Sequence, residues 1–190
     1  KDAGQVRGPV QLTFSRSLDP ILPMDVSITR MAVTDPKEAA KAAEQDEQQV
    51  KSEPPNQTMG RKNLIPYGLY ACYGFISANL AQQTDFSEDD LSLFWEAMTH
   101  MFDDDRSASR GFMAVRRFVA FKHVGTDSNA EQRARQAKLG CAPAHKLIEL
   151  GQVVEINKKN GTNVPRGIED YKIDVHKDRI PPGVELIELV

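Results

Sequence analysis

The sequence is poor in the residues that form metal centres and disulfides. Only Cys72 and Cys141 occur among its 190 residues, and its 4 histidines are scattered. Neither cysteine lies in a C-x-x-C pair, so the chain has no zinc-ligand spacing and no disulfide framework. Few cysteines fit a reducing compartment, and we expect a cytoplasmic protein.

Catalytic motifs and long apolar runs are also missing. The chain contains no glycine-rich phosphate loop and no nucleophile elbow. The acidic run at 103–105 could hold a divalent cation through oxygen ligands, but a solvated helix end paired with arginines is the favoured interpretation. No apolar run reaches the roughly 20 residues that a bilayer span needs. We therefore predict no catalytic residue, no metal, no cofactor and no membrane contact.

The charges are segregated along the chain, although the net charge is only -3. Acidic residues concentrate at 35–53 and 88–105, whereas 106–122 holds arginines and a lysine with no acid. Such segregation can give a weakly acidic protein one basic face, which would suit a polyanionic partner.

Hydrophobic periodicity predicts an α+β domain over residues 1–190. At 10–15, Val10, Leu12 and Phe14 alternate with polar residues, as in a half-buried strand. Ser87, with Asp90 three residues later, predicts a capped helix start. The expected strands are 10–15, 24–33, 64–80, 113–123, 153–156, 171–175 and 184–189; the expected helices are 86–102 and 143–150; and 126–136 is expected to be a polar loop.

A charged, proline-punctuated insert at 35–58 separates two of these strands. It is rich in Ala, Glu, Gln and Lys and has no apolar stripe. Arg30 and Met31 precede it, and Met59, Arg61 and Lys62 follow its end. A projection with cationic, thioether-bearing flanks could reach over a nucleic acid and wedge between bases.

Six segments together resemble a known family over essentially the whole chain. In order they are GQVRGPVQLTFSRSLDP (4–20), SITRMAV (27–33), TMGRKNLIPYGLY (58–70), DRSASRG (105–111), APAHKL (142–147) and PGVELI (182–187). They closely resemble the CRISPR-associated Cascade backbone subunit of subtype I-C, a member of the RAMP superfamily.

The resemblance implies a modified RRM-like (ferredoxin-like) core with the insert at 35–58 as its thumb. Copies would stack along one guide RNA (crRNA) into a helical filament, with each thumb flipping one nucleotide. The filament, together with other Cascade subunits, would present the guide to target DNA without catalysis, as part of antiviral defence. Such subunits carry a further N-terminal part with the first core strand, and this chain begins at Lys1. We therefore expect that part to be absent from this sequence.

Guide-RNA contacts should be independent of base sequence, because such a subunit must accept any guide. Cations would neutralise phosphates, serines would donate to phosphate oxygens, and Gly60 would allow close backbone approach. The candidate RNA-binding residues are Gln5, Arg7, Ser15, Arg16, Ser17, Arg30, Met31, Met59, Gly60, Arg61, Lys62, Arg106, Arg110, Arg116 and Arg117.

Several alternatives remain open at this point. Met31 can be a base wedge or a core residue. The run Tyr67, Leu69, Tyr73 and Phe75 shares one strand face, where burial is favoured over base stacking.

Two rival functions also remain. A RAMP ribonuclease acting on guide precursor or target RNA would have to use a residue such as Asp35 or His145. Alternatively, the insert binds a protein partner and the chain is a plain interaction domain.

Overall fold

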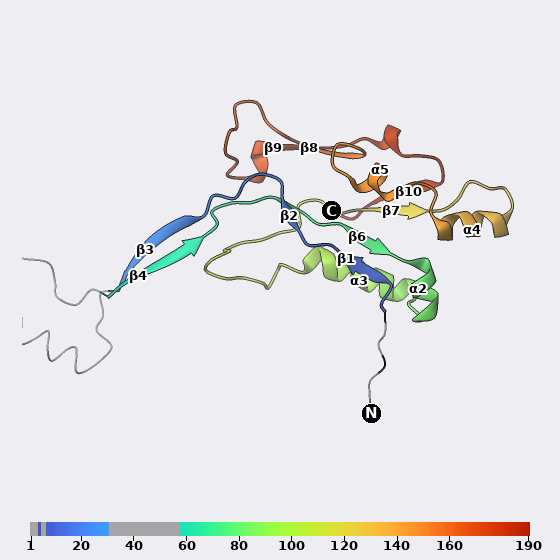
Figure 1. The fold of residues 1–190 in the computed structure, drawn as a ribbon, viewed down its shortest axis with the longest axis horizontal. Coiled ribbons are helices and arrows are strands. Elements are labelled where there is room, and N and C mark those ends of the chain that lie inside the picture. Colours follow the sequence, from blue (N-terminus) through green and yellow to red (C-terminus); the bar gives the residue numbers. More distant parts are fainter. Residues whose placement is uncertain (1–3, 5–6, 31–57) are drawn as a thin grey trace, which may run out of the picture. The chain divides into compact units, whose positions relative to one another are not determined.

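The computed structural model describes residues 4, 7–30 and 58–190 (Figure 1). These residues divide into two compact units. The larger unit comprises the described residues up to Ile21 together with Tyr67–Arg106 and Phe112–Val190, and the hairpin unit comprises those of Leu22–Pro66 together with Ser107–Gly111. All but the last residue of the predicted insert at 35–58 lie outside the described residues.

The hairpin unit is built on β3 (Met24–Arg30) and β4 (Thr58–Leu64). The two strands pair antiparallel from Met24 opposite Leu64 to Arg30 opposite Thr58 (Figure 1). Polar and apolar residues alternate along β3. The strand predicted at 24–33 is therefore confirmed over 24–30. Because Arg30 and Thr58 are ladder partners, the chain leaves and re-enters the hairpin at adjacent positions.

In the larger unit, the N-terminal segment runs antiparallel to 70–76. β1 (Val10–Leu12) pairs with β6 (Gly74–Ile76), and β2 (Arg16–Ser17) pairs with β5 (Tyr70–Ala71). The prediction of one strand over 64–80 is therefore wrong. Pro66 has no amide hydrogen to donate to a ladder, and Ser77 caps a short helix, α2 (Ala78–Gln83).

Helix α3 (Glu88–His100) confirms the capped helix predicted from the sequence. The Asp90 carboxylate accepts from the Ser87 amide at 2.8 Å, and the Asp90 amide donates to Ser87 Oγ at 3.1 Å. Trp95, on the half-buried face of α3, packs edge-on against Phe118 with ring centroids 5.4 Å apart. The capping box satisfies amides that would otherwise have no partner at the helix start.

Helix α4 (Ala130–Leu139) corrects the prediction of a polar loop at 126–136. The Asn129 side chain caps it by accepting from the amides of Glu131 and Gln132, at 2.9 and 3.2 Å. Its Ala, Glu, Gln and Arg residues favour helix intrinsically, but they form no apolar stripe. Hydrophobic periodicity therefore gave no helix signal at 130–139, whereas the helix propensity of these residues and the Asn129 cap did.

The C-terminal half adds a short helix and two ladders. The helix is α5 (Ala144–Ile148). β8 (Val154–Lys158) pairs with β9 (Tyr171–Val175) after it. β7 (Val119–His123), which precedes α5, pairs with β10 (Val184–Glu188). Two 3-10 turns lie at Ile168–Asp170 and Lys177–Arg179. Among the described residues, the strands form separate two-stranded ladders. Their mixture with helices agrees with the predicted α+β class.

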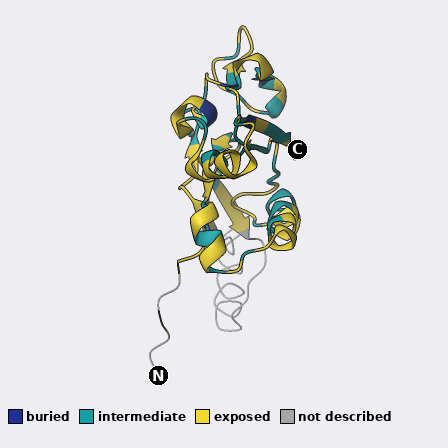
Figure 2. Ribbon diagram, turned by 90° about the vertical axis from the view of Figure 1, so that its right-hand side faces the viewer, coloured by how far each residue is buried: buried dark blue, intermediate teal, exposed yellow. Residues whose placement is uncertain are grey.

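The buried core of the larger unit is small. Figure 2 shows mostly exposed and intermediate residues. The buried hydrophobic residues of the described chain are Leu147, Val153, Val154, Tyr171 and Val184. Since all five lie in α5, in β8, β9 or β10, or directly before β8, the C-terminal half carries the buried packing of this unit.

Tyr171 also ties the N-terminal segment to that core. Its hydroxyl donates to Asp19 Oδ2 at 2.6 Å, and Lys158 Nζ lies 2.8 Å from Asp19 Oδ1. Bonds from Lys158 and Tyr171 lower the pKa of the Asp19 carboxyl, while burial and the neighbouring Asp19 raise the pKa of the Tyr171 hydroxyl. Because Asp19 follows β2 by two residues, these contacts fix the position of β2.

Candidate nucleic-acid interface

Among the cationic residues of the β3–β4 hairpin whose side chains are described, Arg61 is the most exposed. It lies opposite Ser27 on the polar face of the ladder, and its side chain is 84% exposed. Its guanidinium reaches Asp25 at 3.8 Å, which is a weak, solvent-screened ion pair. A phosphate could replace Asp25 at little cost.

Lys62 points to the other face of the hairpin, because successive strand residues alternate. It lies opposite Val26, is half-buried, and shares its face with Ile28 and Leu64. A lysine in such a position can lay its stem on apolar surface while its ammonium stays in water. Gly60, opposite Ile28, is open, since a Cβ there would meet nothing within 4 Å.

The segment Ser107–Gly111 belongs to the hairpin unit and forms a tight turn. The Gly111 amide donates to the Ser107 carbonyl at 2.6 Å, and Gly111 has a φ of 63°, a left-handed conformation that favours glycine. Arg110 is exposed on this turn, and its Nε donates to Ser107 Oγ at 3.4 Å. Arg106 belongs to the larger unit, where it is exposed and donates to the Asp103 carbonyl.

The N-terminal candidates lie in the larger unit. Arg7 and Ser15 are exposed outside the strands, and Arg16 is exposed on β2, opposite Ala71. Ser17 is half-buried and, as the next strand residue, points to the opposite face from Arg16. The structure therefore places Ser15 and Arg16, but not Ser17, on well-exposed surface.

Arg116 and Arg117 differ in their surroundings. Arg117 donates to Glu188, whose other carboxylate oxygen lies 2.7 Å from Lys177. These cations lower the pKa of Glu188, with the Lys177 bond as the largest cause. Arg116 is exposed, and its charge opposes the rise that burial causes in the pKa of Tyr67. Arg117 thus contributes to local structure, whereas Arg116 is open to a ligand.

The side chains of the remaining four candidates lie outside the part that the structure describes. Gln5 and Met31 lie outside the described residues. Arg30 and Met59 belong to the β3–β4 ladder, but their side chains are not among those described.

Comparison with known proteins decides the family. The model of the family described as CRISPR-associated protein Cas7 matches residues 1–176. The chain belongs to this family. No curated protein matches the chain. Cas7 membership suggests a backbone subunit of a CRISPR effector, and it implies RNA binding and assembly into a Cascade complex.

Of the two residues named for a nuclease, only His145 lies in the part of this Cas7 chain that the structure describes. Asp35 lies outside the described residues, and His145 is exposed on α5 without a polar side-chain partner among them. Within the described ranges, no three His, Cys, Asp or Glu residues are grouped to hold a metal ion. Asp103 bonds to His100 Nδ1 at 2.8 Å, and its backbone carbonyl accepts from Arg106. No helix in the part that the structure describes is long and apolar enough to cross a membrane.

Two aromatic residues of the Cas7 chain differ in how far they are exposed. Tyr67 is half-buried, and its ring centroid lies 6.4 Å from that of Tyr171, so it packs as expected. Phe14, predicted to be half-buried with Val10 and Leu12, is instead 98% exposed, and Leu12 is 52% exposed. It lines a groove of about 390 Å³, together with Arg16. Sequence reasoning missed Phe14 as a functional candidate because period-two alternation assigned it to the core.

Proposed function

We propose that this chain is the non-catalytic crRNA-binding backbone subunit of a cytoplasmic type I-C surveillance complex. Copies polymerise along the guide RNA, and the filament presents that RNA to target DNA. The observation that carries the proposal is the Cas7 family match over residues 1–176. The six ordered segments that resemble subtype I-C support the finer assignment, including an RRM-like core.

The β3–β4 ladder supports a thumb at 35–58. Its last pair joins Arg30 to Thr58, so everything between them is an insertion whose ends are adjacent. Arg61 extends from the polar face of the strand that leaves the insertion. An insertion with a cation at its base can reach across a nucleic-acid strand while the base of the hairpin holds a phosphate.

The exposed candidates favour recognition of the RNA backbone. Arg7, Arg16, Arg61 and Arg116 are exposed, and none forms a close ion pair among the described residues. Arginine on an open surface binds phosphate in any sequence, as a subunit that accepts every guide requires. The pairing edges of the bases are then left for the target strand.

Assembly on RNA is the direct test of this function. The purified chain should retain RNA and form particles whose size grows with RNA length, and nuclease digestion should give protected fragments at regular intervals. Neither precursor RNA nor target RNA should be cut, with or without divalent metal. Absence of bound RNA together with no RNA-dependent assembly would refute the proposal, and cleavage would move the chain to the ribonuclease alternative.

We predict that Arg61→Ala weakens RNA binding more than Lys62→Ala. The Arg61 side chain is 84% exposed, whereas Lys62 lies half-buried over an apolar face. Loss of one phosphate contact should lower the slope of log affinity against log salt by about 0.7 per bound subunit. Fluorescence anisotropy on unrelated RNA sequences at several salt concentrations measures both quantities.

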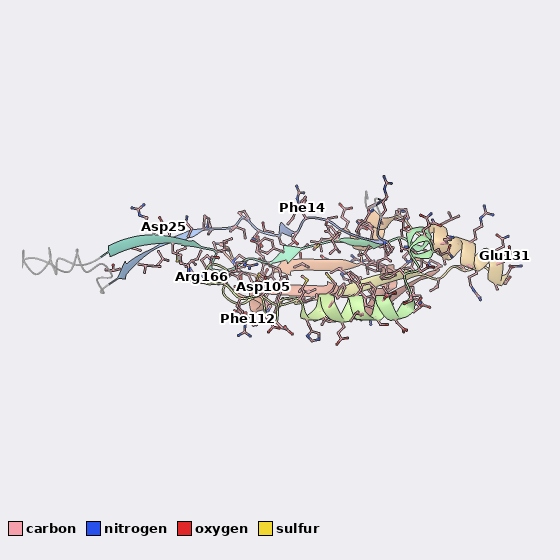
Figure 3. All side chains as sticks on the ribbon, turned by 90° about the horizontal axis from the view of Figure 1, so that it is seen from below. Phe14, Asp25, Asp105, Phe112, Glu131 and Arg166 are labelled. Atoms are coloured by element: carbon pink, nitrogen blue, oxygen red, sulfur yellow. The ribbon has the colours of Figure 1, made fainter. Side chains whose placement is uncertain are left out.

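The matched control is Arg166→Ala, an exposed arginine outside the candidate set (Figure 3). It should leave both the affinity and the salt slope unchanged. A loss in Arg61→Ala that is confined to certain RNA sequences would contradict a backbone contact.

A further inference from the structure

Phe14 is the most exposed large hydrophobic residue of the described chain. Its relative exposure is 98%, and it lies between the polar residues Thr13 and Ser15 on the connection from β1 to β2 (Figure 3). Burying a phenylalanine is worth roughly 1.5–3 kcal/mol, and the fold forgoes that gain here. An aromatic ring held in water beside a groove therefore needs a functional explanation.

The position of Phe14 is fixed by the pairing on both sides of it. Leu12 pairs with Gly74 and Arg16 pairs with Ala71, so the segment between Leu12 and Arg16 has one residue more than the segment opposite. Within that segment the Thr13 amide donates to the Tyr73 carbonyl at 2.8 Å, and the Tyr73 amide donates to Thr13 Oγ1 at 3.1 Å. An extra residue in one strand is the mark of a β-bulge, which redirects a side chain.

The groove beside the ring has apolar walls and one cation. Its volume is about 390 Å³, and its lining includes Phe14, Leu18, Tyr73 and Leu150 together with Arg16. Arg16 is exposed, and no side chain among the described residues forms an ion pair with it. No carboxylate or amide side chain lines the groove, and its polar side-chain groups are the Arg16 guanidinium and the hydroxyls of Thr13 and Tyr73.

We propose that a nucleobase of single-stranded RNA stacks on Phe14 at this groove, while Arg16 binds the adjoining phosphate. This site rests on the proposed function and names one contact of that function. Aromatic rings bind unpaired bases by stacking, which tolerates any base because every base has a π-face. The volume accommodates a base, and a single ring beside a cation matches the base and phosphate of one nucleotide.

The test compares Phe14→Trp, Phe14→Leu and Phe14→Ala for binding to an RNA of mixed sequence. Phe14→Leu and Phe14→Ala should each lose about tenfold in affinity, whereas Phe14→Trp should bind as the wild type does. On an oligomer of abasic ribose–phosphate of the same length, all four proteins should bind equally. Arg16→Ala should weaken binding to both ligands, because its contact is with phosphate.

Two further measurements distinguish base stacking on residue 14 from an effect of the substitutions on the fold. The single tryptophan of the wild type, Trp95 on α3, packs against Phe118, so RNA should quench extra fluorescence only in Phe14→Trp. Since Phe14 is exposed, its variants should unfold at the same urea concentration as the wild type. Phe112→Leu is the matched control for an exposed ring, at 78% exposure, and should bind RNA normally.

The outcomes separate this site from the proposed function. If the wild type binds RNA and Phe14→Leu binds it equally well, the stacking site is refuted while the proposed function stands. If Phe14→Leu instead abolishes self-association in the absence of RNA, Phe14 is a protein contact and the stacking site is refuted. If the wild type binds no RNA, the proposed function and this site fail together.

Discussion

Replacing Tyr171 by alanine should destabilise the larger unit by roughly 3–5 kcal/mol. Tyr171 is only 7% exposed and belongs to a core with few other buried members among the described residues. The substitution removes a buried ring, its contact with Tyr67 and the hydroxyl bond to Asp19. A domain has about 5–15 kcal/mol of stability in total, so a large fraction of it would be lost. Urea unfolding of the purified chain, followed by circular dichroism, measures the change.

Two companion variants separate the ring from its hydroxyl. Tyr171→Phe keeps the ring and should cost about 1–3 kcal/mol, because only the bond to the Asp19 carboxylate is lost. Tyr70→Ala removes a tyrosine that is 48% exposed on β5 and should cost less than about 1 kcal/mol. Equal losses in Tyr171→Ala and Tyr70→Ala would contradict the assignment of the core to the C-terminal half.

The pH dependence of stability provides an independent check on the same contact. Bonds from Lys158 and Tyr171 lower the pKa of Asp19 in the folded state. A carboxyl group whose pKa is lowered by folding stabilises the folded state at pH values above its ordinary pKa. This stabilisation is lost as the pH falls through the lowered pKa. Stability should therefore decrease on acidification in that window, and it should decrease less steeply in Tyr171→Phe.

Local signals in the sequence predicted the elements that depend on local physics. The α3 start follows from Ser87 and Asp90, which are three residues apart and bond to each other's side chains and amides. The strand at 171–175 follows from alternation within that segment. The α4 helix was missed because it has no apolar stripe, although Asn129 carried a capping signal that could have revealed it.

Contacts between distant segments could not be predicted in the same way. Asp19 and Tyr171 are 152 residues apart, and nothing in either neighbourhood specifies the other as a partner. The exposure of Phe14 depends on how many residues lie opposite it, which is a property of pairing and not of one segment. For the candidate site, the strand predicted at 64–80 begins after Arg61 and Lys62, so only the observed β4 shows that the two side chains face opposite ways.

Deleting 37–51 should leave folding intact and abolish the regular spacing of copies on RNA. The β3–β4 ladder closes at Arg30 and Thr58, so a shorter connection between them still allows every described pair to form. A shorter loop also costs less entropy to close, so the urea midpoint should change little. Nuclease digestion of the assembled complex measures the spacing: the wild type should give a regular ladder of fragments, and the deletion variant an irregular one.

A second variant separates the reach of the insert from its chemistry. Replacing 37–51 by glycine and serine residues of equal number keeps the length but removes the charges. If the insert acts only as a spacer, this variant should restore the regular ladder, whereas a thumb that holds the RNA by its own side chains predicts an irregular one. Unfolding of the deletion variant would show instead that 37–51 contributes to the core. In that case the insertion between Arg30 and Thr58 would be part of the fold and not a projection from it.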